Sequence, residues 1–464
     1  MRPILLIDFG STYTKLTAVD CDVPCILGRA QAATTVTTDI SEGLENALGL
    51  LAAQTGGIEY SVRLACSSAA GGLRMVACGL VPELTAKAAQ YAAFGAGAKV
   101  IKTFAYELTA EDAREIAGIA PDILLLVGGT DGGNSEVVRK NAAVIAAIPG
   151  SFPVVYAGNR TAKAECMDVL SASSHPAYAA PNVMPSFGKL DVAPAQQIIR
   201  DIFLKRIVLA KGLSRFQGVL DGILMPTPSA VLRALTLLSE GLPGKPGIGE
   251  LVAVDLGGAT TDVYSIASGL PNDSSTMLRG LREPYVKRTV EGDIGMRYGA
   301  LGVLEEAGMA ELCAVSGLAA EKVETLLHAL RQNPSHLPQN PDEEALDFAL
   351  ATLAIRAGLL RHAGTVEQVY TLVGAVYQQV GKDLRNVQRV LLTGGALTSR
   401  SDCDGVMCRA VAVQDPSVLI PRAFTVTVDR DYILSAMGLL ADMEPDAAFA
   451  LLYHHFGKEE HHGT

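Results

Sequence analysis

The same short pattern occurs twice in the chain, and this repeat limits the folds that the sequence can adopt. Residues 4–8 form an apolar run that ends in Asp8, a glycine follows, and residues 15–19 alternate polar and apolar side chains. Residues 250–266 repeat the arrangement, with Asp255 at the end of the apolar run. Such patterns are typical of two paired strands joined by a tight turn. The repeat predicts two related halves, each opening with a strand, a loop that carries Asp and Gly, and a second strand.

The rest of the chain is expected to form insertions around these halves. The Gly- and Pro-rich segment 241–250 is expected to link them. Residues 99–160 alternate strand-like and helix-like segments, which predicts a βαβ unit with helices on both faces of a parallel sheet. Residues 300–330 and 342–380 have helical periodicity and predict a helical insertion near 300–385. The expected units are a first lobe at 1–84 and 175–245, an inserted βαβ subdomain at 85–174, a second lobe at 246–430, and a C-terminal helix and tail at 431–464.

The composition is that of a large folded protein. The 464 residues correspond to about three domains, and 49% hydrophobic with only 19% charged residues excludes disorder for most of the chain. With 38 Lys+Arg against 49 Asp+Glu the net charge is −11. This acidic balance, without a basic run, argues against nucleic acid or an anionic membrane surface as the main partner.

Hydropathy and cysteine content indicate the compartment. Mean hydropathy is high, at +0.27, but no uninterrupted run of about 18 apolar residues occurs, so we expect no membrane-spanning helix. Asp8 ends the first apolar run too early for a signal peptide. Eight cysteines are too few for a disulfide scaffold, so we expect a cytoplasmic protein.

The first loop, DFGSTYTKL at 8–16, has the chemistry of a phosphate-binding turn. Gly10 lets the backbone approach an anion, and consecutive N–H groups there can form a concave nest. The hydroxyls of Ser11 and Thr12 add donors, and Lys15 adds positive charge. Asp8, at a strand end, can hold a hydrated Mg²⁺, which needs few carboxylates. An ordinary hairpin turn explains this single loop equally well.

The second loop, DLGGATTDVYS at 255–265, offers the same groups, and an ordinary turn is again the alternative. Two copies in corresponding halves favour facing loops that clamp a polyphosphate and its metal between two lobes, where ligand sites tend to form. A third segment, LLTGGALTS at 391–399, is a strand followed by Gly394 and Gly395 and a helix start. Glycines there allow a base and ribose to lie against the backbone, with phosphates near the helix N-terminus.

In order, spacing and composition, the three segments resemble the phosphate-1, phosphate-2 and adenosine segments of the actin-like ATPase superfamily. The resemblance implies an α/β fold of two ribonuclease-H-like lobes, with a βαβ insertion in the first and a helical insertion in the second. It also implies Mg·ATP or Mg·ADP in the cleft between them, consistent with the absence of a G-x-x-x-x-G-K-[ST] motif. The implied nucleotide-binding residues are Gly10, Ser11, Thr12, Tyr13, Lys15, Gly257, Gly258, Ala259, Thr260, Thr261, Gly394, Gly395 and Ala396.

A closer resemblance covers essentially the whole chain. It is similar to the MutL-type accessory family of glutamate mutase, a bacterial family distinct from the mismatch-repair protein of that name. The segments that carry the resemblance are 66–82, 124–134, 154–160, 182–203 and 284–298.

The resemblance implies an ATPase or chaperone-like factor whose partners are the subunits of an adenosylcobalamin-dependent mutase. An ATP cycle would open a tight interface and release damaged cobalamin, because opening requires different affinities for open and closed states. On this hypothesis Asp8 and Asp255 are the catalytic residues and Mg²⁺ ligands that orient the attacking water. Positioning and electrostatic stabilisation would supply most of the rate effect.

Two other functions stay open. A small-molecule kinase of the same superfamily would need a general base, for which Asp131 and Asp293 are candidates. An activator of a 2-hydroxyacyl-CoA dehydratase would need two closely placed cluster cysteines, which the cysteine pattern supports poorly. The sequence leaves open which mutase is served and whether the chain forms a homo-oligomer.

Two further segments have both a functional and a plain structural interpretation. The loop VGGTDGGN at 127–134 ends a strand with four glycines, and it is either a ligand or partner loop or a tight βα turn. In PYVKRTVEGDIGMRY at 284–298, Glu291, Gly292 and Asp293 either line the nucleotide cleft or belong to a solvated loop.

Overall fold

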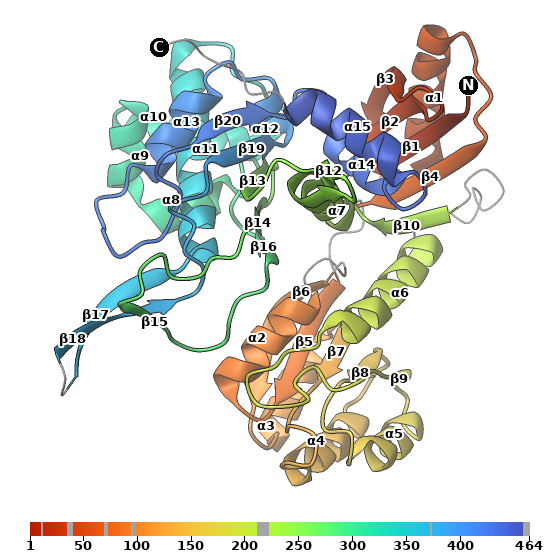
Figure 1. The fold of residues 1–464 in the computed structure, drawn as a ribbon, viewed down its shortest axis with the longest axis vertical. Helices are drawn as coiled ribbons and strands as arrows, with labels where there is room; N and C mark the ends of the chain where they lie inside the picture. Colours follow the sequence, from red (N-terminus) through yellow and green to blue (C-terminus); the bar gives the residue numbers. More distant parts are fainter. Residues whose placement is uncertain are drawn as a thin grey trace. The chain divides into compact units, whose positions relative to one another are not determined.

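The structure is a computed structural model that describes residues 1–10, 13–34, 40–68, 73–93, 96, 98–210, 222–371 and 374–457. The chain, whose fold is drawn in Figure 1, divides into two compact units. Unit 1 consists of Met1–Ala234 and Ser435–Leu451, and unit 2 of Leu235–Leu434 and Leu452–Thr464.

The first sheet of unit 1 has five strands in the order β10-β4-β1-β2-β3. β1 and β2 form the predicted antiparallel hairpin, β3 extends it antiparallel, and β4 and β10 add in parallel on the other side. α1 packs against β2 and β3. The bounds are β1 Pro3–Phe9, β2 Tyr13–Asp20, β3 Cys25–Ala33, α1 Ile40–Thr55, β4 Val62–Ser67 and β10 Gly222–Pro226.

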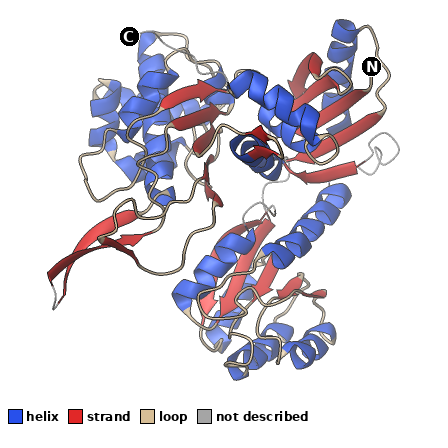
Figure 2. Cartoon of the chain, in the orientation of Figure 1, coloured by secondary structure: helices blue, strands red, loops and turns tan. Residues whose placement is uncertain are grey.

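A second sheet is inserted in the chain between β4 and β10. Its five strands are all parallel, in the order β6-β5-β7-β8-β9, with helices between them (Figure 2). The strands are β5 Leu73–Gly79, β6 Ala98–Ala105, β7 Ile123–Leu126, β8 Val154–Tyr156 and β9 Ala177–Ala179. The helices are α2 Pro82–Ala93, α3 Ala110–Ile119, α4 Glu136–Ala146, α5 Lys163–Ser171 and α6 Ala193–Ala210.

The apolar run of β7 explains why this sheet is covered on both faces. Leu124 and Leu126 belong to one buried cluster, whereas Ile123 and Leu125 belong to another. Successive strand residues point to opposite faces, so a continuous apolar run is typical of a parallel sheet buried on both sides.

The main sheet of unit 2 repeats the topology of the first sheet. Its order is β16-β14-β13-β19-β20, in which β13, β14 and β16 are antiparallel neighbours and β19 and β20 add in parallel. The bounds are β13 Leu251–Leu256, β14 Thr261–Ile266, β16 Val286–Glu291, β19 Arg389–Thr393 and β20 Thr425–Val428. The repeated hairpin in the sequence is therefore part of a repeated five-stranded arrangement.

Several helices of unit 2 pack around α11 beside this sheet. α11 is buried over most of its length and packs against β13, β14 and β16 and against α8, α9 and α13. The bounds are α8 Ala300–Ala307, α9 Met309–Ser316, α10 Ala320–Gln332, α11 Pro341–His362, α12 Gly395–Thr398 and α13 Cys403–Val411.

One prediction about unit 2 is wrong. The helix expected over 342–380 ends at His362, and the residues after it form strands β17 Thr365–Thr371 and β18 Gly374–Val380, which pair with each other and with β15 Thr276–Leu278. The β-branched and aromatic residues of this segment favour strands over a helix. The expected linker 241–250 contains a short hairpin of β11 Gly241–Leu242 and β12 Lys245–Pro246.

Three helices follow the last strands of the two repeated sheets. α7 Thr227–Glu240 begins directly after β10, α14 Ile433–Leu440 follows β20, and α15 is Pro445–Phe456. The boundaries between the units fall within α7, within α14 and within α15.

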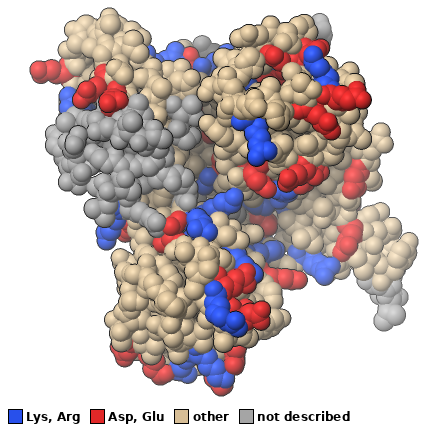
Figure 3. Space-filling view, turned by 180° about the vertical axis from the view of Figure 1, so that it is seen from behind, with Lys and Arg blue, Asp and Glu red and all other residues tan. Residues whose placement is uncertain are grey.

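The predicted mixed α/β architecture with parallel sheets is confirmed. Charged side chains of both signs are interspersed among uncharged ones on the described part of the face drawn in Figure 3. Among the helices that the structure describes, none combines the length and hydropathy needed to cross a membrane.

Candidate functional site

The first hairpin places Asp8 at the end of β1, directly opposite Lys15 on β2. The turn closes through a hydrogen bond of 3.0 Å from the Gly10 N–H to the Tyr13 carbonyl. A Cβ on residue 10 would lie 2.6 Å from that carbonyl oxygen, so the turn requires glycine. The predicted Ser11 and Thr12 lie outside the described residues.

The Asp8 carboxylate is held by a residue that the sequence did not single out. Asp8 is only 7% exposed, and its Oδ1 accepts a hydrogen bond of 2.6 Å from the Thr227 hydroxyl. Thr227 is the first residue of α7, and its hydroxyl oxygen also lies 3.6 Å from the Cys66 sulfur. Cys66 is the neighbour of Asp8 on β4. Burial and the Asp8 charge raise the pKa of the Cys66 thiol well above its ordinary value.

The second hairpin has the same geometry at the corresponding residues of unit 2. Asp255 ends β13 opposite Asp262 on β14, and the Gly257 N–H donates to the Thr260 carbonyl at 2.9 Å. Thr261 is fully buried, and its hydroxyl donates to the Ile294 carbonyl at 2.9 Å.

The loop after β16 forms backbone hydrogen bonds with the turn of this second hairpin. The Met296 N–H donates to the Gly257 carbonyl at 3.0 Å, and the Arg297 N–H donates to the Gly258 carbonyl at 2.8 Å. The Arg297 guanidinium is nearly buried and pairs with Asp347 of α11 at 2.8 Å. Thus the segment 284–298 does contact the predicted phosphate-2 residues, mainly through its backbone.

Glu291 and Asp293 lie on either side of Gly292 in that segment. Glu291 is buried at the end of β16, where it forms an ion pair with Arg361. Burial raises the pKa of Glu291, although Arg361 opposes this effect. The carboxylate of Glu291 is therefore engaged with Arg361 within unit 2.

The third predicted segment lies beside the second hairpin. Thr393 at the end of β19 neighbours Asp255 of β13, and Gly394 follows it. Gly394 has φ +99°, and a Cβ there would lie 2.3 Å from the Leu256 carbonyl oxygen. The short helix α12 then contains Gly395 and Ala396, the other predicted residues of this segment. Unit 2 therefore brings the phosphate-2 and adenosine segments together, whereas the first hairpin belongs to unit 1.

Hydrogen bonds from neighbouring segments hold the glycine-rich loop at 127–134 in place. The Asp131 carboxylate accepts hydrogen bonds of 2.9 Å from the Arg160 N–H and from the Asn182 side-chain amide. Asn159 is fully buried, and its amide donates to the carbonyls of Gly133 and Asn134. These contacts show how the loop is ordered as a βα connection.

Unit 2 also buries a cluster of polar groups around Ser265, at the end of β14 opposite the turn of the second hairpin. The Lys382 ammonium donates to the Ser265 hydroxyl at 3.0 Å and to the Tyr285 carbonyl at 2.8 Å. His362 Nε2 lies 2.8 Å from the same hydroxyl oxygen of Ser265. Burial lowers the pKa of Lys382 to about 7, with Lys287 adding to the effect. The pKa of His362 is lowered well below its ordinary value, also mainly by burial.

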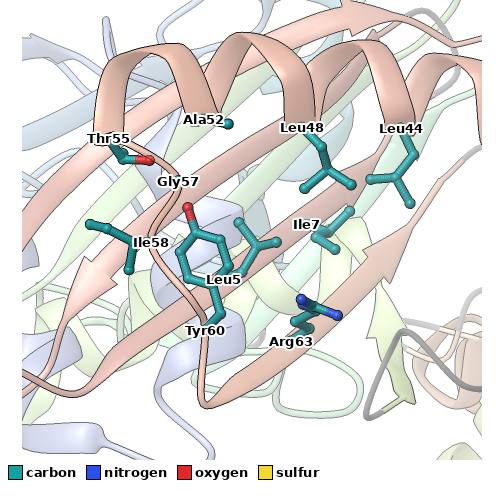
Figure 4. A pocket seen from close by; sticks show the side chains of 10 residues that line it. All are labelled: Leu5, Ile7, Leu44, Leu48, Ala52, Thr55, Gly57, Ile58, Tyr60 and Arg63. Carbon is teal, nitrogen blue, oxygen red and sulfur yellow. The ribbon is translucent and has the colours of Figure 1, made fainter.

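Figure 4 shows a pocket of 230 Å³ in unit 1, between α1 and the first sheet. Leu44 and Leu48 point from α1 toward Leu5 and Ile7 of β1, and Arg63 lies at the pocket's edge. The other lining residues are Ala52, Thr55, Gly57, Ile58 and Tyr60. None of the predicted site residues lines this pocket. Among the described residues, no group of three or more His, Cys, Asp or Glu is placed to hold a metal ion.

Two solved structures resemble the chain only distantly. Component A of the (R)-2-hydroxyglutaryl-CoA dehydratase of Acidaminococcus fermentans has a TM-score of 0.36 and 10% identity, over 97% of this chain and 100% of that chain. The ADPNP-bound activator of the 2-hydroxyisocaproyl-CoA dehydratase of Clostridium difficile has a TM-score of 0.33 and 11% identity, over 97% of each chain. At these TM-scores the likenesses carry no argument about function.

The comparison of sequences is much closer. Protein MutL of Clostridium tetanomorphum is 44% identical over 455 residues, which are 97% of this chain and 98% of that protein. The family described as MutL protein matches residues 4–456. The family resemblance that the sequence motifs indicate is thus confirmed, and the chain belongs to the MutL protein family.

Proposed function

We propose that the chain binds Mg·ATP and hydrolyses it slowly while acting as an accessory factor of an adenosylcobalamin-dependent mutase, with glutamate mutase as the expected partner. The partner assignment rests on membership of the MutL family. In this proposal the nucleotide cycle releases damaged cobalamin from the mutase, and the protein acts in the cytoplasm.

The duplicated hairpin is the observation that carries the nucleotide part of the proposal. In both copies an aspartate ends the first strand, and the glycine two residues later donates its N–H to the carbonyl three residues further on. The two sheets that carry these hairpins have the same strand order and directions. We therefore infer that the sheets are the ribonuclease-H-like lobes of an actin-like ATPase fold.

The residues of the hairpins fit a magnesium nucleotide. Carboxylate oxygens such as those of Asp8 and Asp255 are the ligands that Mg²⁺ prefers, and the ion needs only one or two of them when phosphates and water complete its shell. When bound, Mg²⁺ would neutralise charge on the phosphate oxygens. The two aspartates would hold the ion and orient the attacking water. The backbone amides of Gly10–Thr12 and Gly257–Ala259 would bind phosphate oxygens, helped by Lys15, Thr260 and Thr261.

The test is ATP hydrolysis by the purified chain, alone and with a mutase whose cobalamin has been replaced by cyanocobalamin. Slow hydrolysis should rise with the inactivated mutase, and cyanocobalamin should be released only when ATP is present. Asp8→Asn and Asp255→Asn should each abolish hydrolysis, because the proposal assigns both carboxylates to the same nucleotide. Formation of ADP and of a phosphorylated product that requires a small hydroxyl compound and is unaffected by the mutase would instead identify a kinase.

A further inference from the structure

The hydrogen bond between Thr227 and Asp8 joins two parts of unit 1 that are 219 residues apart in the chain. β10 pairs with β4, and β4 pairs with β1, so the end of β10 comes close to the end of β1. Thr227 follows β10 directly, and Pro228 occupies the second position of α7, where a proline favours a helix start. The hydroxyl is therefore carried by backbone that is fixed on both sides.

The hydrogen bond runs from Thr227 to Asp8. A threonine hydroxyl has one hydrogen to donate, and its oxygen lies 2.6 Å from Asp8 Oδ1 and 3.6 Å from the Cys66 sulfur. The contact with Asp8 has the better hydrogen-bond distance, so the Thr227 hydroxyl donates to Asp8.

At the corresponding place in unit 2, the hydroxyl and the carboxylate exchange positions. There a carboxylate, Asp429, follows the last strand, and the hydroxyl is that of Thr393 beside Asp255. Asp429 is fixed by the N–H groups of Ile433 and Leu434 at the start of α14. In unit 1, by contrast, the residue after the last strand is Thr227, and it bonds directly to the carboxylate of the candidate aspartate Asp8.

We propose that Thr227 is a positioning residue for Asp8, which holds the carboxylate in one orientation through Oδ1 while the nucleotide is bound and hydrolysed. This inference rests on the nucleotide hydrolysis proposed above. Reacting groups must be held in place to a fraction of an ångström, and a displacement of about 1 Å can cost about 100-fold in rate. Without the hydroxyl, the nearly buried carboxylate would turn toward another donor.

The experiment compares Thr227→Val, which keeps the shape and removes the hydroxyl, with Thr227→Ser, which keeps the hydroxyl. Thr227→Val is expected to lower kcat for ATP by about 10-fold to 100-fold, with less than a threefold change in KM. ADP binding is then measured by calorimetry at several Mg²⁺ concentrations. Thr227→Val should need at least about tenfold more Mg²⁺ than the wild type for half-maximal ADP binding. Thr227→Ser should restore both quantities to within about threefold.

Two controls separate the possible outcomes. Thr352→Val removes a fully buried hydroxyl on α11 that has no hydrogen-bond partner, so it tests the same substitution in unit 2, outside the unit that contains Asp8. It should change neither kcat nor the Mg²⁺ requirement. If Asp8→Asn is inactive while Thr227→Val keeps the wild-type kcat and Mg²⁺ requirement, the positioning role is overturned and the proposed function stands. If Asp8→Asn hydrolyses ATP normally, the assignment of Asp8 in the proposed function fails, and the role of Thr227 fails with it.

Discussion

Gly438 of α14 lies so close to Ala230 of α7 that a Cβ on residue 438 would be 1.8 Å from the Ala230 carbonyl oxygen. Both residues belong to unit 1, and the atom in the way is backbone. Helices α7 and α14 therefore touch, within unit 1, at a position where only glycine fits.

Gly438→Ala is expected to destabilise the protein, because α7 and α14 must separate to admit one methyl group. Overpacking of this kind typically costs about 1–3 kcal/mol. The control is Gly49→Ala in α1, where a Cβ would meet nothing within 4 Å and where alanine favours the helix. Urea unfolding should show a lower midpoint for Gly438→Ala and an equal or higher midpoint for Gly49→Ala. Equal midpoints for Gly438→Ala and the wild type would contradict the close contact.

The buried Lys382 predicts how stability depends on pH. Its folded-state pKa is about 7, whereas the ordinary value is 10.5, so between these values unfolding takes up a proton. Burial and Lys287 lower this pKa, and Glu283 and Glu250 oppose them. The free energy of unfolding due to this group therefore rises with pH over the window, by up to about 1.4 kcal/mol per pH unit.

Lys382→Met should remove this contribution. The difference between wild type and variant in the free energy of unfolding is expected to grow by about 2 kcal/mol in favour of the wild type between pH 7 and pH 9. Replacement of the exposed Lys322 by Met is the control and should give a constant difference over the same interval. A constant difference for Lys382→Met as well would mean that the ammonium is charged in the fold throughout this range.

Gly394 and Gly395 offer a matched pair of substitutions in the third predicted segment. Gly394→Ala places a side chain at φ +99° and 2.3 Å from the Leu256 carbonyl oxygen, so it should displace the second hairpin. Gly395→Ala meets only the Tyr432 hydroxyl, at 3.4 Å, and should be tolerated in the absence of ligand. Thermal unfolding with and without Mg·ADP should show a lower melting temperature and a smaller ADP-induced rise for Gly394→Ala. If both variants melt like the wild type, the close contact of Gly394 with Leu256 of the second hairpin does not contribute to stability.

The ion pair of Arg297 and Asp347 is expected to support the second hairpin. Asp347→Ala leaves a nearly buried guanidinium without its partner, which typically costs about 3–5 kcal/mol. Glu367→Ala removes the partner of Arg279 in an exposed pair and should cost less than about 1 kcal/mol. Chemical denaturation of the two variants measures the contrast. Similar losses for both would show that the pair of Arg297 and Asp347 does not stabilise the loop at 291–299.

The sequence predicts the two hairpins well because their signals are local. Asp8 and Asp255 each stand between an apolar run and an alternating segment, and the glycine two residues later requires a turn. The strands β6, β7 and β8 are found for the same reason. The sequence pattern does not reveal β5, because the Ala- and Gly-rich residues that precede it carry no strand pattern.

The contacts that organise the candidate site are long-range, and no local pattern contains them. Thr227 reaches Asp8 only because β4 lies between β10 and β1, a pairing that crosses the whole insertion. Arg297 supports the second hairpin through α11 in the same way. The wrong helix at 365–380 has a different cause: the polar residues of the β17–β18 hairpin occur at spacings that also fit a helix.

The insertion between β4 and β10 also has a consequence for the order in which the protein assembles. β10 can join the first sheet only after the entire five-stranded inserted sheet has been synthesised, whereas the inserted sheet is made of strands adjacent in the chain. Local pairings form faster than distant ones, and domains generally fold as units during synthesis. The inserted sheet is thus expected to be the first folded part of the nascent chain. Unit 1, which also includes Ser435–Leu451, is completed only when the C-terminal helices arrive.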